Sequence, residues 1–385
     1  MRKEWNSRQR VEAVINHQEP DRVPIDMTLT INPYLGLLDL LDIHPQEEIK
    51  MSDFTEVRPH PDVLKALGVD ITFIKLHSPV NWIPKPTTPD GVSYDGWGIG
   101  RKKIEVSPGI MLNEIVDEPL KDKTIADLDD FPWPDPEDPG RTDGLEEEAR
   151  ELYEGTDLAI MGRFGGTLFE TAANMRGWEQ WMMDLLINKD FVSAVIERIL
   201  HIQMRLDERG LRAAGKYLSI FKLSGDDFGI QDRPLYSMDL WNSTILPIME
   251  RRWRNARAIL DEVAPDVKLM MHSDGAIRPF IPDMIKCDID ILDPIQRHCP
   301  GMDIYELKRD FGEQLTFHGV VDTQKVLPHG TTDDVKEEVL TCLDALAPGG
   351  GFICGPVHNV QGDVPAENLV ALCDTVKEHG RYPIS

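Results

Sequence analysis

Eight short runs of apolar residues recur along the chain, and polar residues follow each run directly. Each run is nearly continuous in apolar residues, which is typical of strands buried on both faces of a parallel sheet. The pattern therefore predicts eight β-strands, in runs that begin at Val23, Val69, Asp157, Tyr217, Val267, Ile289, Leu315 and Gly351.

Amphipathic stretches with helix start and stop signals lie between most of these runs. The clearest predicted helices span residues 188–214, 234–263 and 331–347. Alternation of eight strands with helices predicts an α/β fold of the (β/α)8 TIM-barrel type. A doubly wound sheet is the alternative, and the lack of a GxGxxG turn after the first strand disfavours it.

Residues 78–140 interrupt the alternation. This stretch is rich in proline, and Tyr94-Asp95-Gly96-Trp97-Gly98 followed by alternating residues predicts a β-hairpin. We interpret it as a proline-rich hairpin insertion after the second strand, lying over the barrel mouth. An independent second domain is the alternative, so the prediction is a single barrel domain over residues 1–385.

Composition excludes several classes of function. The chain has 41 Lys and Arg against 67 Asp and Glu, giving a net charge of −26. Such a chain is a poor ligand for nucleic acid or an anionic membrane. The five cysteines form no CxxC pair, and we see neither a signal peptide nor a membrane-length apolar run. These features predict a cytoplasmic protein. They leave the oligomeric state open and are compatible with a homodimer.

The polar residues that follow the strands are the candidate site. In a TIM barrel the active site lies at the carboxyl ends of the strands, so these side chains should gather at one mouth. The candidates for binding substrate there are Asp26, His77, Arg163, Gln296, Asp322 and Asn359.

His272 and Asp274 end the fifth run in the sequence His-Ser-Asp-Gly. Two residues apart on an extended strand, they share one face, and Gly275 allows a sharp turn. Imidazole and carboxylate suit zinc or ferrous iron if another strand supplies a third ligand. An aspartate that orients the histidine without metal is an equal alternative from spacing alone.

Other residues have a structural and a chemical interpretation. Glu170 follows a glycine pair and suits a helix start, where its charge favours the dipole. Asp226 and Asp227 are adjacent, so both cannot point inward and one can cap the next turn. An isolated histidine such as His358 is more often structural, and Cys354 is more often a small apolar core residue.

Several segments resemble the uroporphyrinogen decarboxylase superfamily. The specific ones are DRVPID, MMHSDGAI, ILDPIQ, FHGVVDTQ and the ending GPVHNVQGDVPAENL. The resemblance covers nearly the whole chain and implies a (β/α)8 barrel. The superfamily includes true decarboxylases and zinc methyltransferases that work with corrinoid proteins.

Departures from the superfamily patterns separate these two branches. True decarboxylases carry an arginine pair after the first strand, and DMTLTINPY contains no arginine. The methyltransferases use a His-x-Cys pair after the fifth strand and a second Cys near the last. Those positions fall here on His272, Asp274 and His358, so the resemblance implies a ligand set of two histidines and one carboxylate.

The sequence therefore predicts a metal-dependent, methyltransferase-like enzyme that binds a divalent metal, with zinc the first choice. A corrinoid would come from a partner protein, and a small molecule would donate or accept the methyl group. Glu170 or Asp226 would supply the fourth ligand or a proton, with Asp227 as a third catalytic candidate. The rival is a metal-free decarboxylase in which Asp26, Asp226 or Asp227 binds a pyrrole or amine. A non-catalytic ligand-binding barrel comes third.

Overall fold

A computed structural model describes residues 5–45, 49, 56–107, 110–223 and 225–384. Ser224, in the fourth predicted strand run, and residues 108–109 of the predicted insertion lie outside the described residues. Seven strands form one parallel sheet in the order β3-β7-β8-β9-β10-β11-β12. They are β3 (Ile71–Lys75), β7 (Ala159–Arg163), β8 (Ile220–Leu223), β9 (Lys268–His272), β10 (Ile291–Asp293), β11 (Thr316–His318) and β12 (Phe352–Ile353).

The first predicted strand run lies between the two edges of this sheet. Ile25 forms a parallel bridge with Cys354 beyond β12. On its other side, the amide of Asp70 donates a 2.8 Å hydrogen bond to the carbonyl of Ile25. Because the segment bonds to both edges, the sheet curls into a TIM-barrel-like arrangement, as the strand pattern predicts.

Side chains inside the curled sheet form a separate apolar cluster. It includes Ile71 of β3, Met161 of β7, Met270 of β9 and Ile353 of β12, which lie far apart in the sequence. Helix α1 (Ser7–Val14) packs Val11 and Val14 against the same cluster. The cluster fills the interior, so a polar site has room only at the ends of the strands.

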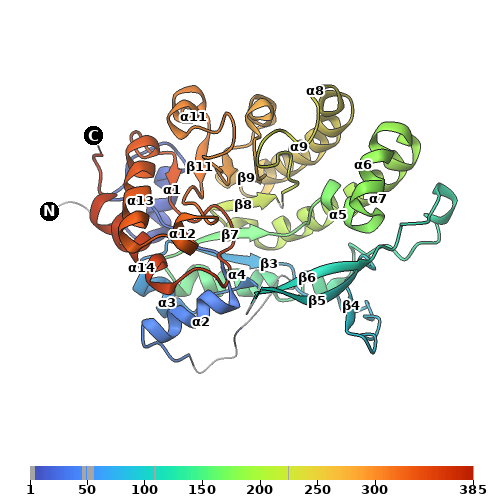
Figure 1. The fold of residues 1–385 in the computed structure, drawn as a ribbon, viewed down its shortest axis with the longest axis horizontal. Helices are drawn as coiled ribbons and strands as arrows, with labels where there is room; N and C mark the ends of the chain where they lie inside the picture. Colours follow the sequence, from blue (N-terminus) through green and yellow to red (C-terminus); the bar gives the residue numbers. More distant parts are fainter. Residues whose placement is uncertain (1–4, 46–48, 50–55, 108–109, 224, 385) are drawn as a thin grey trace.

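Helices surround the sheet (Figure 1). The α-helices after α1 are α2 (Ile31–Leu40), α3 (Pro61–Leu67), α4 (Leu145–Gly155), α5 (Phe169–Arg176), α6 (Trp178–Ile187), α7 (Lys189–Ala214), α8 (Met238–Leu240), α9 (Leu246–Val263), α10 (Ile281–Lys286), α11 (Ile304–Phe311), α12 (Val326–His329), α13 (Thr332–Leu346) and α14 (Ala366–His379). The shorter turns are η1 (Ile125–Asp127), η2 (Pro139–Arg141), η3 (Gly215–Tyr217), the π-helical η4 (Trp241–Ile245) and η5 (Arg278–Phe280). Among these helices, none is both long and apolar enough to cross a bilayer.

The three clearest predicted helices are present, and one is interrupted. α13 begins with a capping box between Thr331 and Asp334, as its sequence indicates. The helix expected over 234–263 is divided into α8, η4 and α9. Pro247 lies in the first turn of α9 and has no N–H to bond to the preceding turn, which accounts for the irregular π-helical turn there.

A short antiparallel pair joins β1 (Leu29–Thr30) and β2 (Glu56–Val57). The expected insertion contains another antiparallel sheet, of β4 (Val92–Tyr94), β5 (Gly100–Ser107) and β6 (Ile110–Asp117). The chain after it packs on α7, where the guanidinium of Arg209 donates to the carbonyls of Pro136 and Asp138. Two features stay predictions: the placement of the insertion over the barrel mouth, and a single domain over residues 1–385.

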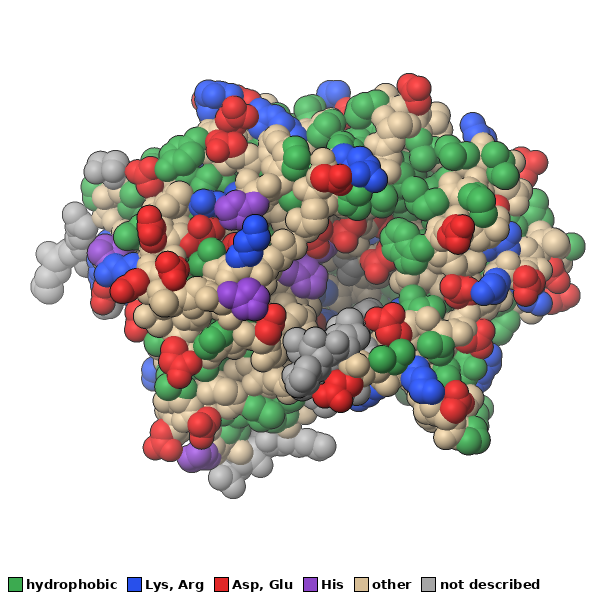
Figure 2. Space-filling model, in the orientation of Figure 1, with side chains coloured by type: hydrophobic (Ala, Val, Ile, Leu, Met, Phe, Trp, Pro, Cys, Tyr) green, Lys and Arg blue, Asp and Glu red, His purple; other side chains and the backbone are tan. Residues whose placement is uncertain are grey.

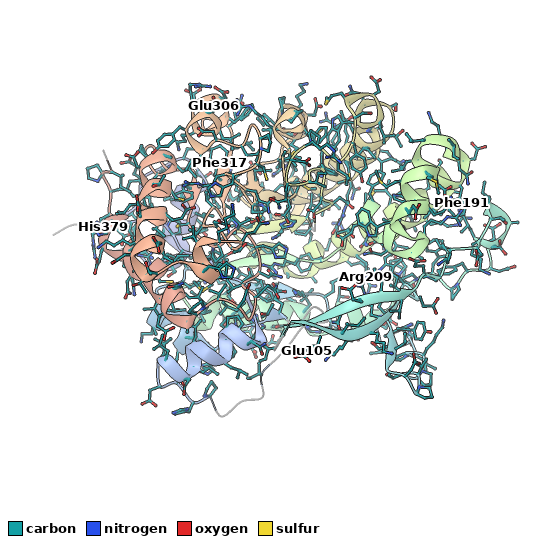
Figure 3. All side chains as sticks on the ribbon, in the orientation of Figure 1. Glu105, Phe191, Arg209, Glu306, Phe317 and His379 are labelled. Atoms are coloured by element: carbon teal, nitrogen blue, oxygen red, sulfur yellow. The ribbon has the colours of Figure 1, made fainter. Side chains whose placement is uncertain are left out.

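Alternation along β11 separates the core from the site. Phe317 is fully buried among the side chains between sheet and helices, where Figure 3 labels it. Its neighbour His318 points to the opposite face of the strand, as the period of two requires. His318 therefore lies on the inner side of the curled sheet.

Candidate metal centre

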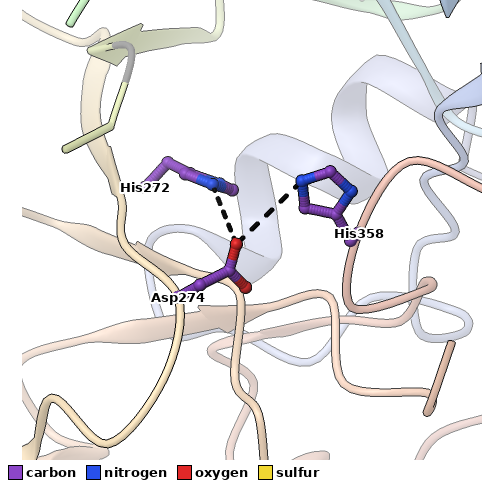
Figure 4. Close-up of side chains that lie close together, drawn as sticks. All are labelled: His272, Asp274 and His358. Atoms are coloured by element: carbon purple, nitrogen blue, oxygen red, sulfur yellow. Dashed lines mark ion pairs between the residues drawn. The ribbon is translucent and has the colours of Figure 1, made fainter. Parts of the chain in front are cut away.

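The structure brings His272, Asp274 and His358 together at the carboxyl end of the sheet (Figure 4). His272 is the last residue of β9, and His358 follows β12. Oδ2 of Asp274 lies 3.5 Å from Nε2 of His272 and 4.0 Å from Nε2 of His358. One ligand atom from each residue lies within 4.8 Å of the other two, so the three groups can share one ion after a small inward movement.

The turn after the first two members depends on glycine. Gly275 has φ +86°, a conformation that L side chains rarely adopt. A Cβ there would meet the backbone carbon of Gly229 at 2.4 Å. Oε1 of Gln296 accepts a 2.6 Å hydrogen bond from the amide of Gly275. Gln296, expected to bind substrate, thus holds the turn that presents Asp274.

Asp274 has the properties of a metal ligand. Its Oδ1 is buried and has no hydrogen-bond partner among the described residues, whereas its Oδ2 faces both histidines. A buried carboxylate oxygen without a partner is costly and calls for an explanation. Two imidazole nitrogens beside this carboxylate form a donor set that suits zinc or another divalent metal, so the residues present fit the group.

The far side of the His272 ring is fixed by a buried carboxylate. Nδ1 of His272 donates a 2.8 Å hydrogen bond to Oδ2 of Asp293, its neighbour across the β9–β10 ladder. Burial lowers the pKa of His272, but its contacts with Asp274 and Asp293 outweigh burial and raise it to about 10. Burial likewise acts to raise the pKa of Asp274. Its contacts with His272 and His358 together outweigh burial, so the pKa of Asp274 is lowered.

Two residues that the sequence analysis did not select complete this buried network. Nδ1 of His318 contacts Oδ1 of Asp293 at 2.5 Å, and its Nε2 contacts Oδ2 of Asp26 at 2.9 Å. Nζ of Lys222 donates a 2.6 Å hydrogen bond to Oδ2 of Asp293. Although burial opposes it, Lys222 and His318 hold the pKa of Asp293 well below its usual range. The available signal was a charged residue inside an apolar run, in FHGVV and IFKLS.

A hollow opens beside this network. Figure 2 shows it near the centre of one face, with acidic and histidine side chains gathered around it. It is lined by polar side chains from six segments of the barrel, namely Asp26, Thr28, Lys222, His272, Asp293, His318, His358 and Asn359. Asp26 and Asn359, expected to bind substrate, therefore lie beside the three candidate ligands.

Comparison with known proteins establishes the family. A model of the uroporphyrinogen decarboxylase (URO-D) family matches residues 113–379, more than half of the chain. This chain belongs to the URO-D family. No curated protein matches the chain. Among solved structures, a methyltransferase from Methanosarcina mazei is similar over 97% of this chain and 99% of its own, with 18% identity and a TM-score of 0.61. An endo-1,4-β-xylanase from Penicillium canescens is 11% identical over 60% and 78% of the two chains, with a TM-score of 0.38.

The adjacent aspartates of this URO-D family member have different surroundings. The carboxylate of Asp226 is buried and accepts hydrogen bonds from the amides of Leu168 and Glu170, at 2.9 and 2.8 Å, so it caps α5. Burial outweighs these bonds and raises the pKa of Asp226 to about 6. Asp227 is half-exposed, and its Oδ1 lies 3.9 Å from Nε2 of His272. Asp227 therefore faces the candidate ligands, and Asp226 does not.

Glu170 lies beside these carboxylates at the start of α5. Burial, followed by the charges of Asp226 and Asp227, raises the pKa of Glu170 to about 7. Burial and Asp274 also raise the pKa of Asp227. Glu170 can thus change protonation close to neutral pH, which is a property of acid–base residues.

Three expected substrate ligands are bonded elsewhere in the structure. His77 contacts Glu148 of α4 through Nε2 at 2.8 Å. Arg163 donates to Glu56 at 2.6 Å and lies over the ring of Phe73. Oδ1 of Asp322 accepts from the amide of Gln324 at 2.7 Å, and this residue lines a neighbouring pocket with Gln296. None of these three contacts His272, Asp274 or His358 in the described part of the chain.

Proposed function

We propose that this URO-D family protein is a metal-dependent methyltransferase. The observation that carries the proposal is the convergence of His272, Asp274 and His358. Oδ2 of Asp274 faces both histidines, and its buried Oδ1 has no hydrogen-bond partner among the described residues. The similar full-length fold of the Methanosarcina mazei methyltransferase supports the same branch of the family. His272, Asp274 and His358 would hold the ion, with zinc the first choice because of the nitrogen and oxygen donors.

The bound metal would act as a Lewis acid on the methoxy, thiol or amine group of the substrate. Asp227, beside His272, and Glu170, with a pKa of about 7, are positioned to hold a proton that the substrate loses or gains. Asp226 keeps the α5 terminus in place, which positions Glu170 at the site. Asn359 and Asp26 line the hollow where a small substrate would lie.

We further propose that the methyl group moves to or from a corrinoid bound to a partner protein. The corrinoid is inferred from the family resemblance of the MMHSDGAI and GPVHN segments. Two mixtures test this: the protein with methylated cobalamin and a panel of thiols and amines as acceptors, and the protein with reduced cob(I)alamin and a panel of methoxy compounds as donors. Loss or gain of the methyl group changes the visible spectrum of the corrinoid. Transfer that proceeds equally with and without cobalamin would contradict the corrinoid role.

Metal analysis tests the metal role directly. We expect protein purified without chelator to contain close to one divalent ion per chain, and Asp274→Ala to lose most of it. Asp322→Asn is a matched control, because Asp322 is also a buried carboxylate beyond a strand end but does not contact the three ligands. Full metal occupancy in Asp274→Ala with loss of activity would make Asp274 a proton-transfer residue instead of a ligand.

A uroporphyrinogen decarboxylase activity is a poorer fit. The decarboxylases hold the substrate carboxylates with arginines, and DMTLTINPY supplies none. Among the residues that line the hollow, arginine is absent and the lysine is Lys222, which is bonded to Asp293. We expect uroporphyrinogen to be turned over poorly. Coproporphyrinogen formation with a kcat on the order of 1 s⁻¹ or above would refute the methyltransferase proposal.

A further inference from the structure

Asp293 is the centre of the buried polar network under the candidate ligands. It ends β10 and is 4% exposed. Its Oδ1 contacts Nδ1 of His318, and its Oδ2 accepts from both Nδ1 of His272 and Nζ of Lys222. Three donors from three different strands therefore meet on one carboxylate.

The contacts of His318 define its protonation state. Both ring nitrogens face carboxylate oxygens, Nδ1 toward Asp293 and Nε2 toward Asp26. A carboxylate only accepts, so His318 can satisfy both neighbours only as the doubly protonated imidazolium. Its pKa, raised to about 9 by Asp293 and Asp26 against the opposing effect of burial, agrees with this state. Two cations, His318 and Lys222, thus balance the two carboxylates.

The carboxylate of Asp293 determines which ring nitrogen of His272 carries a proton. An ionised Asp293 can only accept, so Nδ1 of His272 must carry a proton. The remaining nitrogen, Nε2, is then the atom that lies 3.5 Å from Asp274 and is available to a metal. The β9–β10 register places Asp293 directly beside His272, so paired strands hold both groups in position.

We propose that Asp293, bonded to His318 and Lys222, is the positioning residue that keeps Nε2 of His272 directed at the metal. The inference rests on the proposed function and adds three residues to it. A carboxylate behind a histidine ligand fixes the ring and strengthens the ligand, and its loss typically weakens metal binding 10- to 100-fold.

A purely structural role accounts less well for the network. Buried charges are costly to desolvate, and apolar residues of similar size often stabilise a fold as well or better. Five ionisable groups lie side by side at the barrel mouth, next to Oδ1 of Asp274, which has no hydrogen-bond partner in the part of the chain that the structure describes. A site that needs these groups explains them better. A structural role would change stability alone, whereas the positioning role changes metal affinity and ring orientation.

The test compares zinc dissociation constants, measured by chelator competition, for wild type, Asp293→Asn and Lys222→Met. We expect Asp293→Asn to weaken zinc binding by about tenfold or more, and Lys222→Met by a smaller factor. Asp290→Asn is the control, because Asp290 precedes the same strand at the opposite end and pairs with Arg257 instead of His272. Its zinc affinity should stay within about twofold of wild type.

Crystal structures of the metal-free variants supply a readout that needs neither metal nor activity. In Asp293→Asn the ring of His272 should turn away from Asp274, while Asp290→Asn should keep it. Zinc affinity within about twofold of wild type and an unmoved ring in Asp293→Asn would overturn the inference. If Asp293→Asn does not fold, the zinc affinity and the orientation of the His272 ring in Lys222→Met decide instead. Wild type that binds no zinc would refute the proposed function instead, and the ring orientation would still decide the role of Asp293.

Discussion

Zinc affinity should depend steeply on pH because a proton competes for Nε2 of His272. In the metal-free protein the pKa of His272 is raised to about 10, so the ring is doubly protonated at pH 7. Nδ1 keeps its proton in the bond to Asp293, so the proton that must leave is the one on Nε2. Asp274 has a lowered pKa and is already ionised, so it contributes no proton at neutral pH.

The magnitude follows from the distance between this pKa and the working pH. Removing a proton from a group of pKa about 10 at pH 7 costs about 4 kcal/mol, at 1.36 kcal/mol per unit. Loss of one proton per metal bound makes the dissociation constant fall about tenfold for each unit rise in pH. Between pH 6.5 and 8.0 we therefore expect about a thirtyfold tightening.

Calorimetry in two buffers with different ionisation enthalpies counts the protons released at a fixed pH. Chelator competition across the pH range measures the affinity itself. Release of about one proton from His272 at pH 7 is the expected result. A zinc affinity that is flat over this range, with no proton released, would refute the reasoning, because His272 would then be neutral before the metal arrives.

The raised pKa of His272 also makes the stability of the metal-free protein depend on pH. The folded pKa of His272 lies above its usual value of 6.5, so the protonated form stabilises the fold. This stability is fully present below pH 6.5 and is lost as the pH rises toward 10. Chelator-treated protein should thus unfold at lower urea concentration at pH 9 than at pH 6.5.

Three further variants test the structure around the site. Asp226→Ala should lower the free energy of unfolding in urea by about 2 kcal/mol, because it removes the cap of α5. Asp227→Asn should leave the urea midpoint unchanged and lower the rate of methyl transfer. Equal losses of stability in the two variants would contradict this division of roles. Arg252→Ala leaves the buried carboxylate of Asp207 without its charged partner and should cost about 3–5 kcal/mol by the same measurement. A loss under about 1 kcal/mol would contradict this. Gly275→Ala should weaken zinc binding in chelator competition, because the new methyl group meets backbone at 2.4 Å; unchanged affinity would mean that the turn can yield.

The barrel and its helices were readable in the sequence because the patterns that specify them are local. Continuous apolar runs predict buried parallel strands, and seven of the eight runs are strands of one sheet. Capping residues such as Thr331 and Asp334 mark the helix ends within one turn of the chain. The position of polar residues after strands, together with the family resemblance, was enough to select His272, Asp274 and His358.

The partners of these residues were decided by the tertiary structure. Asp293 meets His272 because of the β9–β10 register, and His318 meets Asp26 across 292 residues of sequence. No local pattern distinguishes Asp226, which caps α5, from its neighbour Asp227, which faces the site. Hydrophobic periodicity specifies which face of a strand is buried, but a hydrogen bond requires two atoms within about 3 Å. That distance depends on how the strands pair and curl, and it exists only once the barrel has formed.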